Sequence, residues 1–335
     1  MSVPADTIHF NQSYMNYQYH WSSFPSVMAF ITWFYMLPTI YITIKIIVVY
    51  LTNDWNIVEP GKNQYVFLVI SLSQLSSLLY FLFSYMLIRL PATGLFTSYC
   101  AGIEPNKWLL VITIMTSYTN YLSMLYPFFM PIVRLVLVMF PKSHNKINSI
   151  IMRIVVPLSL VYPFCFIFFL FPAVGVCKQL SFPYPFGSIW IYYHGQAFGL
   201  RNTPLFLFNS IFWLISSILA NVILFVKLAR AREQLITQDS ASVSYRAQVS
   251  ISYTTIAMIV FYVVNGFMSI TYNLFYGTNN IMAYSLVIRH FASDAQTCMV
   301  TWIFYKTHPV FEKSSTTANV NPTSVVFEKV RSSQS

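Results

Sequence analysis

The sequence predicts an all-α membrane protein, a seven-transmembrane helix bundle with its N-terminus outside the cell and its C-terminus in the cytosol. Seven long apolar segments fill most of the 335 residues. Only 8% of the residues are charged, whereas 56% are hydrophobic and 18% are aromatic. A spanning helix needs roughly 20 apolar residues, because the hydrocarbon core is about 30 Å thick. Continuous apolar runs indicate helices, because the strands of a membrane barrel alternate apolar and polar residues.

The seven segments leave no room for a second folded domain. Residues 1–24 form a predicted extracellular segment, residues 25–305 the helix bundle, and residues 306–335 a cytosolic tail that is too polar to fold. The seventh segment is the weakest prediction, because it contains Arg289, His290 and Asp294, and a charge at mid-membrane is costly. The expected helices cover 25–51, 65–90, 107–139, 150–171, 204–227, 249–275 and 281–305.

The orientation follows from the basic residues, which stay on the cytosolic side during insertion. Fourteen of the nineteen Lys and Arg residues fall on the predicted cytosolic side, four fall outside, and Arg289 lies within the seventh segment. Residues 1–24 lack the pattern of a cleavable signal peptide, so the first apolar segment is expected to act as a signal anchor. The net charge of +10 therefore reports topology, and no nucleic-acid partner is expected.

Two features of the predicted outer side concern covalent chemistry. Asn11 begins the one Asn-x-Ser/Thr triplet without a proline after the Asn, and it is a candidate glycosylation site, although such triplets also arise by chance. Of the four cysteines, Cys165 and Cys298 fall within helices, whereas Cys100 and Cys177 face the oxidising medium. A Cys100–Cys177 disulfide would hold the long outer loop over the mouth of the bundle. Two free cysteines are the alternative.

The outer loop between the fourth and fifth segments is rich in aromatic residues. From 182 to 198 it carries Phe, Tyr and Trp side chains, interrupted by prolines and glycines that mark turns. One interpretation is a lid that lines a binding cavity. The other, which the composition favours slightly, is an aromatic belt resting on the lipid interface.

Arg134 is the most informative polar residue of the third segment. It lies near the inner end, and Pro141 follows seven residues later. An arginine there can extend to the cytosolic headgroups, which is a purely structural role. Together with seven spans, an external N-terminus and an outer cysteine pair, however, the pattern resembles a G-protein-coupled receptor. That resemblance implies that Arg134 holds the inactive helix packing and faces the G protein once helix six moves away.

The departures from rhodopsin-like receptors are also specific. Those receptors carry an acidic residue before this arginine, where this chain has Val133, and their Asn-Pro-x-x-Tyr motif is absent here. Four other motifs are present: Tyr-Met-Leu-Pro at 35–38, Pro-Phe-Phe-Met-Pro-Ile-Val-Arg at 127–134, Phe-Gly-Ser-Ile at 186–189 and Ser-Asp at 293–294. With these motifs the chain resembles the nematode serpentine chemoreceptors of the Srg superfamily, class U in particular, from about residue 16 to residue 309. The resemblance implies odour or taste detection at the plasma membrane of a sensory neuron cilium, with signalling through a heterotrimeric G protein.

The ionisable residues of the seventh segment are candidates for contact with a small-molecule ligand. His290 and Asp294 are four residues apart, so they share a helix face and could hydrogen-bond. With Arg289 they either contact a polar ligand or form an internal polar network that fixes helix packing, and the network is favoured. An apolar odorant would instead contact aromatic side chains, among them Tyr118, Tyr121 and Tyr262.

On the cytosolic side, Arg230 and Arg232 lie among apolar residues that extend the fifth segment. This stretch suits the C-terminal helix of a Gα subunit, although basic residues near a membrane also meet anionic lipid. The tail beyond residue 309 is rich in Ser and Thr. Phosphorylation there could recruit an arrestin-like protein, with a plain solvated tail as the default.

No catalytic, cofactor or metal site is expected. The six histidines lack metal-ligand spacing, and the chain has neither a Gly-rich phosphate loop nor a close pair of carboxylates. Two other functions stand beside the receptor. A ligand-gated channel subunit, like the insect odorant receptors, predicts a cytosolic N-terminus, which the charge distribution disfavours. A small facilitative transporter should show internal repeats, which the sequence lacks.

Overall fold

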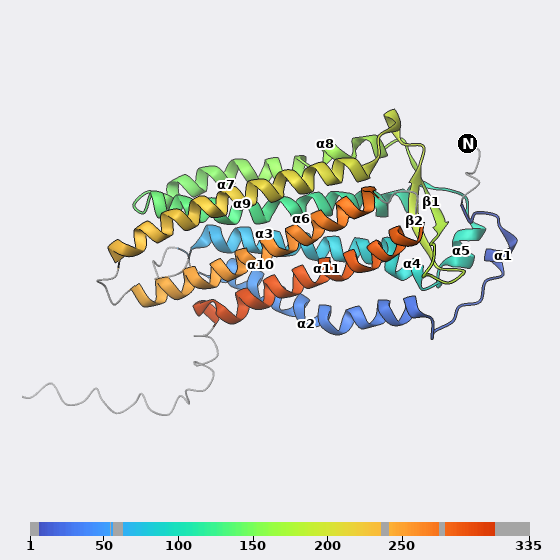
Figure 1. Ribbon diagram of the computed structural model, residues 1–335, viewed down its shortest axis with the longest axis horizontal. Helices are drawn as coiled ribbons and strands as arrows, with labels where there is room; N and C mark the ends of the chain where they lie inside the picture. Colours follow the sequence, from blue (N-terminus) through green and yellow to red (C-terminus); the bar gives the residue numbers. More distant parts are fainter. Residues whose placement is uncertain (1–6, 54, 56–62, 236–240, 275–278, 312–335) are drawn as a thin grey trace, which may run out of the picture.

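The computed structural model describes residues 7–53, 55, 63–235, 241–274 and 279–311. Long helices run side by side along the long axis of the molecule (Figure 1). The first begins at the end that carries a small hairpin, and the last ends at the opposite end (Figure 1). The long helices are α2 (Phe24–Thr52), α3 (Gln64–Ser84), α6 (Lys107–Met139), α7 (His144–Val161), α9 (Asn202–Leu235), α10 (Ala241–Leu274) and α11 (Asn279–Thr307).

Five helical segments are long and apolar enough to cross a membrane, by length and composition. They are Phe24–Thr52, Gln64–Ala92, Lys107–Met139, His144–Leu170 and Asn202–Leu228. α10 and α11 have 34 and 29 residues but are less apolar, and α11 carries the three ionisable residues noted in the sequence. The helices of the predicted bundle are therefore present, and the crossing of the membrane by α10 and α11 stays a prediction.

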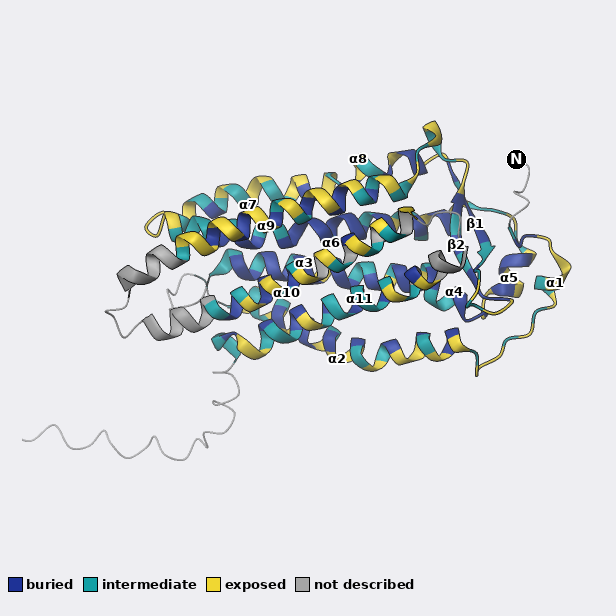
Figure 2. Cartoon of the chain, viewed as in Figure 1, coloured by how far each residue is buried: buried dark blue, intermediate teal, exposed yellow. Residues whose placement is uncertain are grey.

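α3 and α6 form the centre of the bundle. The most apolar windows of these two helices are 61% and 50% buried, whereas those of α2, α7 and α9 are 28%, 22% and 28% buried. Figure 2 shows the same contrast, with exposed residues along the outer faces of α2, α7 and α9. Many of these exposed side chains are large and apolar, for example Phe34 of α2 at 81% exposure and Phe208 of α9 at 63%. Such a surface suits lipid rather than water.

Local sequence signals explain how the two central helices begin. The side chain of Asn63 accepts hydrogen bonds from the backbone N–H groups of Tyr65 and Val66 at the start of α3. Asn106 caps α6 in the same way, through the N–H of Leu109. The backbone stays helical at the C-terminal end of α3. It continues through a π-helical turn, η1 (Tyr85–Arg89), into the short α4 (Leu90–Ala92). A π-helical turn changes the direction in which later side chains point, and it places Arg89 against α11.

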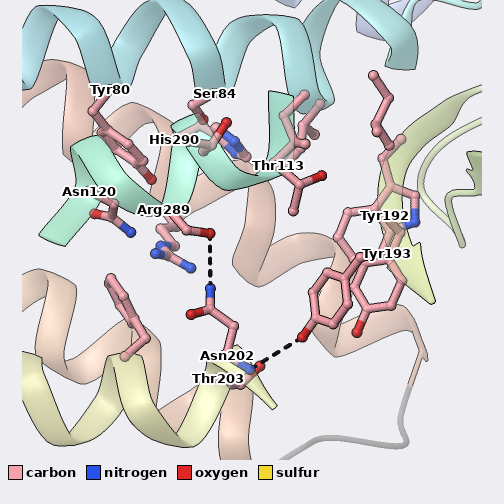
Figure 3. A pocket seen from close by; sticks show the side chains of 17 residues that line it. Tyr80, Ser84, Thr113, Asn120, Tyr192, Tyr193, Asn202, Thr203, Arg289 and His290 are labelled. Carbon is pink, nitrogen blue, oxygen red and sulfur yellow. Dashed lines mark hydrogen bonds between the residues drawn. The ribbon is translucent and has the colours of Figure 1, made fainter. Parts of the chain in front are cut away.

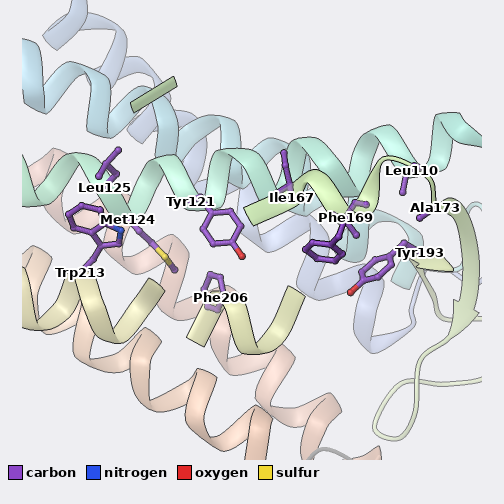
Figure 4. Packing of buried hydrophobic residues seen from close by; sticks show 11 residues of the cluster. Leu110, Tyr121, Met124, Leu125, Ile167, Phe169, Ala173, Tyr193, Phe206 and Trp213 are labelled. Atoms are coloured by element: carbon purple, nitrogen blue, oxygen red, sulfur yellow. The ribbon is translucent and has the colours of Figure 1, made fainter. Parts of the chain in front are cut away.

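Two large clusters of buried apolar side chains hold the bundle together. The outer cluster joins α6 and α9 to residues 167–173, which follow α7, and it contains Tyr121, Phe169, Phe206 and Trp213 (Figure 4). The inner cluster contains Phe67, Met130 and Phe304 among others, and it joins α3, α6 and α11. Five of the eleven buried residues of the outer cluster are aromatic, whereas the inner cluster is mainly aliphatic. Edge-to-face aromatic pairs in both add to the stabilisation from the buried area.

The expectation of an all-α fold is wrong in one place. The predicted aromatic loop forms an antiparallel hairpin of β1 (Val174–Gln179) and β2 (Ile189–His194), in which Cys177 lies opposite Ile191. The reason is local, because Ile-Trp-Ile-Tyr-Tyr consists of β-branched and aromatic residues, which favour strands. The shorter helices are α1 (Gln12–Met15), α5 (Thr97–Gly102), α8 (Phe164–Ile167), η2 (Phe168–Leu170) and η3 (Ala197–Gly199).

Candidate ligand cavity

The hairpin is fastened to the outer end of the bundle at two points. Cys177 of β1 is joined to Cys100 of α5 by a disulfide, the pairing that the sequence favoured. Gly175 forms a backbone bridge with Asn106, directly before α6. A Cβ at Gly175 would overlap the backbone nitrogen of Leu110, so only glycine allows β1 to lie this close to α6.

The N-terminal segment adds a third attachment, through His9. The His9 Nδ1 atom lies 2.7 Å from the carbonyl oxygen of Ile103, and the backbone N–H of Cys177 donates to Nε2 at 3.0 Å. The carbonyl oxygen can only accept, so Nδ1 of His9 carries a proton; the backbone N–H can only donate, so Nε2 does not. These two contacts therefore indicate a neutral imidazole ring. Burial lowers the pKa of His9 below its ordinary value of 6.5, which also favours the neutral ring.

Tyr17 continues this attachment further along the N-terminal segment. Its ring lies against Gly94 and Gly187, two glycines with a positive φ of 89°. The ring of Phe186 packs beside it, with centroids 6.1 Å apart. Residues 8–17 therefore cover the tip of the hairpin and hold it against the bundle.

Beneath the hairpin, the bundle contains a cavity of about 130 Å³ (Figure 3). Its roof is β2, and its walls come from α6, α9, α11 and the continuous stretch of α3 and η1, so five segments distant in sequence meet around it. The structure thus supports the lid interpretation for β2, because its side chains line a cavity. The lining residues are Tyr80, Ser84, Leu87, Ile88, Thr113, Thr116, Ser117, Asn120, Trp190, Ile191, Tyr192, Tyr193, Asn202, Thr203, Phe206, Arg289 and His290.

Asn202, the first residue of α9, connects three walls of the cavity. Its Nδ2 atom donates to the Ser117 hydroxyl at 3.4 Å, and its backbone N–H donates to the Tyr193 hydroxyl at 3.2 Å (Figure 3). Its Oδ1 atom accepts a hydrogen bond from the hydroxyl of Tyr121 at 2.9 Å. α6, α9 and the roof are therefore coupled through one residue, by its side-chain amide and its backbone N–H.

Arg289 and His290 are the two ionisable residues of this wall. The Arg289 guanidinium lies over the ring of Phe206, with 4.3 Å from its central carbon to the ring centroid. Arg289 also lines a second, smaller cavity of about 20 Å³ that reaches deeper, toward Gln296 and Thr297. Of the three ionisable residues predicted to contact a ligand, the structure thus places two, Arg289 and His290, at the cavity.

Asp294 lies elsewhere, in a buried ion pair with Arg89. The two guanidinium nitrogens of Arg89 lie 2.7 and 2.8 Å from the two carboxylate oxygens of Asp294. Arg89 also donates to the Thr32 hydroxyl at 3.0 Å and to the His290 carbonyl oxygen at 3.0 Å. The Tyr35 hydroxyl donates to the same carboxylate. The favoured prediction from the sequence was a polar network of Arg289, His290 and Asp294. Asp294 does lie in a polar network, but its ion-pair partner is Arg89, and Arg289 is not part of it.

The network extends along α11 toward its inner end. The Thr39 hydroxyl donates to Cys298 Sγ at 3.3 Å, and the Trp302 indole N–H donates to the Thr39 hydroxyl at 3.2 Å. One turn away, the Thr301 hydroxyl donates to Gln74 Oε1 at 2.7 Å. Polar contacts thus join α11 to α2 at Thr39 and to α3 at Gln74.

The aromatic candidates take other positions than expected. Tyr118 points toward α7, where its hydroxyl donates to the Leu160 carbonyl oxygen at 2.8 Å, so it does not line the cavity. Tyr121 belongs to the outer apolar cluster and contacts two lining residues of the cavity, Asn202 and Phe206. The side chain of Tyr262 lies outside the described residues.

Sequence reasoning missed several residues of the wall, and one signal could have found them. Thr113, Thr116, Ser117 and Asn120 interrupt an otherwise apolar helix at intervals of three and four residues. This spacing places them on one face of α6. Arg89 carried no comparable signal, because an arginine near the end of a span is ordinary in any orientation.

At the inner end, Arg134 is buried rather than extended toward the headgroups. Only 3% of Arg134 is exposed, and its guanidinium donates to the Ser252 hydroxyl of α10 at 2.9 Å. The interpretation of a snorkelling arginine is therefore wrong, and α6 is tied to α10 at this point. Pro141 is exposed in the turn after α6. The side chains of Arg230 and Arg232 lie outside the described residues.

The other predicted positions are easily placed. Asn11 is exposed at the outer end, where its side chain caps α1 through the N–H of Ser13. In the part of the chain that the structure describes, no cluster of His, Cys, Asp and Glu side chains is arranged to hold a metal ion.

These features define a multi-pass helical membrane protein with a partly polar cavity at one end of the bundle. The chain matches the protein family described as serpentine type 7TM GPCR chemoreceptor Sru, over residues 8–314. It is 38% identical over 260 residues to Serpentine receptor class U-26 of Caenorhabditis elegans, which covers 77% of this chain and 88% of that protein. The chain therefore belongs to the Sru family of serpentine chemoreceptors, a family of receptors and not of enzymes.

The comparison confirms the class that the sequence motifs suggested, class U. The wider assignment to the Srg superfamily stays a prediction. Two residues from the recognised motifs, Tyr35 and Asp294, contact each other in the buried network. The motifs that carried the resemblance therefore include residues with a structural role in joining α2 to α11.

Proposed function

We propose that the chain is a chemosensory receptor that binds an external small molecule, an odorant or a tastant, in the cavity and activates a heterotrimeric G protein. The observation that supports this most directly is the cavity itself. It lies under the hairpin, and helices that continue to the opposite end of the bundle surround it. A ligand that contacts α6 and α11 at one end can change their packing at the other.

The contact between Arg134 and Ser252 supports a route for signalling. It joins α6 to α10 at the inner end, in the position where an outward movement of α10 would break it. In the proposed active state the Arg134 guanidinium is released and faces the G protein. Pro141, Arg230 and Arg232 belong to the same proposed cytosolic face.

The proposed topology has seven spans, with the N-terminus outside and the C-terminus in the cytosol. It places Asn11 and the Cys100–Cys177 disulfide outside the cell, and the Ser- and Thr-rich tail where kinases and an arrestin-like protein could reach it. The exposed apolar faces of α2, α7 and α9 would contact membrane lipid. The proposed location is the plasma membrane of a sensory neuron, in its cilium.

The test follows G-protein nucleotide exchange and membrane current in cells that express the full chain, during exposure to a panel of odorants. A cavity-filling variant, Thr116→Met, should abolish the response to every active odorant. The matched control Val111→Met changes an exposed residue of the same helix and should leave the response unchanged. Ligand-driven current without nucleotide exchange would support the channel alternative, and tracer uptake would support the transporter. Either result would remove the receptor proposal.

A second experiment examines the proposed signalling route without a ligand. Ser252→Ala removes a hydrogen-bond acceptor of Arg134 and should raise basal nucleotide exchange several-fold, because a buried hydrogen bond to a charged group contributes about 1.5–3 kcal/mol. Unchanged basal exchange in a well-expressed Ser252→Ala receptor would contradict this role of Arg134.

A further inference from the structure

Arg289 carries a charge inside the bundle that no residue described by the structure neutralises. It lies ten residues into α11, about 15 Å from the start of the helix. Within the described part of the chain, its guanidinium has neither an ion pair nor a hydrogen bond. It makes a cation–π contact with the Phe206 ring, 4.3 Å from the ring centroid. Ionisable groups at this depth are costly and usually paired.

The nearest acidic residue on the same helix cannot serve as the partner. Asp294 follows five residues later, about 140° around the helix axis from Arg289. Its two oxygens are bound by Arg89, in a bidentate geometry that already satisfies the carboxylate. This part of the bundle therefore holds two guanidinium groups and one carboxylate, which leaves one positive charge facing the cavity.

Two further polar side chains of the cavity also lack partners among the described residues. The Thr113 hydroxyl is buried without a hydrogen-bond partner. The Asn120 side-chain amide lies two turns further along α6, and it makes no hydrogen bond to the described residues. Buried polar groups in proteins are almost always hydrogen-bonded, so these two groups point to a polar ligand.

The charges around the outer end are mostly positive. Lys107, Lys178 and Arg201 lie there, whereas Glu104 is the acidic residue of that end within the described chain. An excess of one sign near a site raises the local concentration of oppositely charged ligands. An anion would therefore be drawn to the outer end before it enters the cavity.

The size of the cavity limits the ligand. An apolar cavity of about 150 Å³ in another protein holds benzene, so the space of about 130 Å³ here suits a ligand of roughly six non-hydrogen atoms. Ile191 and Phe206 contribute apolar surface for a short hydrocarbon part. Drug-sized ligands need cavities of about 300 Å³ or more, so they exceed this space.

We infer that the cavity binds a small organic carboxylate, an inference that rests on the proposed function and names the class of ligand. The Arg289 guanidinium forms two parallel hydrogen bonds to the carboxylate, a geometry for which its planar fork is suited. Asn120 donates to one of its remaining lone pairs. The hydrocarbon part of the ligand packs against Phe206 and the roof.

The test measures binding to the full-length receptor in lipid nanodiscs, separately from signalling. The probes are butanoate, pentanoate and hexanoate, each paired with its primary amide, which has the same shape and no charge. Ligand-induced thermal stabilisation and saturation-transfer NMR report binding. The variants are Arg289→Met, Arg289→Lys and Asn120→Ala, and Arg153→Met is the matched control, because Arg153 is exposed on α7.

At least one carboxylate should bind saturably, and its amide should bind at least about thirtyfold more weakly, as expected when a buried charge pair is lost. Arg289→Met should reduce the affinity for the carboxylate by a similar factor, Arg289→Lys by less, and Arg153→Met not at all. Equal binding of acid and amide, unchanged binding by Arg289→Met, or no binding of any carboxylate would overturn the inference. If Arg289→Met does not fold, the comparison of each acid with its amide and the Asn120→Ala variant still test the inference.

Nucleotide exchange with the same probes separates this inference from the proposed function. Binding of a carboxylate without exchange, in the presence of every candidate Gα subunit, would retain the site and remove the signalling proposal. Exchange driven by neutral odorants in a receptor that binds no carboxylate would retain the receptor and remove the inference.

Discussion

The buried ion pair between Arg89 and Asp294 gives the largest stability effect that we predict for any side chain outside the apolar clusters. The two groups make two hydrogen bonds of 2.7 and 2.8 Å, and only 11% and 4% of their side chains are exposed. Thr32, Tyr35 and the His290 carbonyl complete the shell around them. Removing one partner leaves the other charge buried without compensation, which costs about 3–5 kcal/mol.

The experiment is a double-mutant cycle with Arg89→Met, Asp294→Leu and the combined variant, in which unfolding by SDS is followed by circular dichroism. Each single variant should lose about 3–5 kcal/mol of unfolding free energy. The double variant should lose clearly less than the sum, because no isolated charge remains in it. Arg153→Met, an exposed control, should stay within about 0.5 kcal/mol of the parent. Additive losses, or single variants as stable as the control, would refute the reasoning.

Three further predictions concern the outer end. The pKa of His9 is lowered in the folded protein, so the stabilising contribution of this residue is complete above pH 6.5 and is lost as the pH falls below that value. The thermal midpoint of the parent protein should therefore fall between pH 7 and pH 5. The thermal midpoint of His9→Gln should fall less over the same range. Gly175→Ala should destabilise the hairpin by about 1–3 kcal/mol, seen as a lower thermal midpoint, whereas Gly102→Ala, where a Cβ meets open space, should be neutral. Asn11→Gln should abolish a glycosidase-sensitive shift on gels, and the absence of such a shift in the parent would show that Asn11 is not modified.

The helices could be predicted from the sequence because each requires only a local property, a continuous apolar run. The segment expected at 107–139 coincides with α6, and the segment expected at 25–51 differs from α2 by one residue at each end. The second segment differs more, because η1 and Pro91 interrupt its regular helix before Ala92. A π-helical turn arises from packing against neighbouring helices, so the composition of the segment does not reveal it.

The hairpin was missed although its strand signal was present. Ile189 to Tyr193 combines β-branched and aromatic residues, but the same composition suits an interfacial belt, and the surrounding Pro and Gly residues indicate only turns. What distinguishes the two is the contact of β1 with α6 at Gly175, together with the disulfide to Cys100. Both are long-range contacts. They turn an ambiguous loop into the roof of a cavity.

The choice of partner for Asp294 shows most clearly where sequence reasoning stops. Arg89 and Arg289 are both arginines within reach of the outer half of α11, and Arg289 is far closer to Asp294 in sequence. Helical periodicity already separates Arg289 from Asp294, because five residues correspond to about 140° around the axis. It does not indicate that Arg89, 205 residues away in the chain, is turned toward the carboxylate. Once that pair is formed, the charge of Arg289 has no counterpart on its own helix. The pairing that stabilises one side of α11 therefore determines the charge of the cavity on the other side, and with it the class of ligand that we propose.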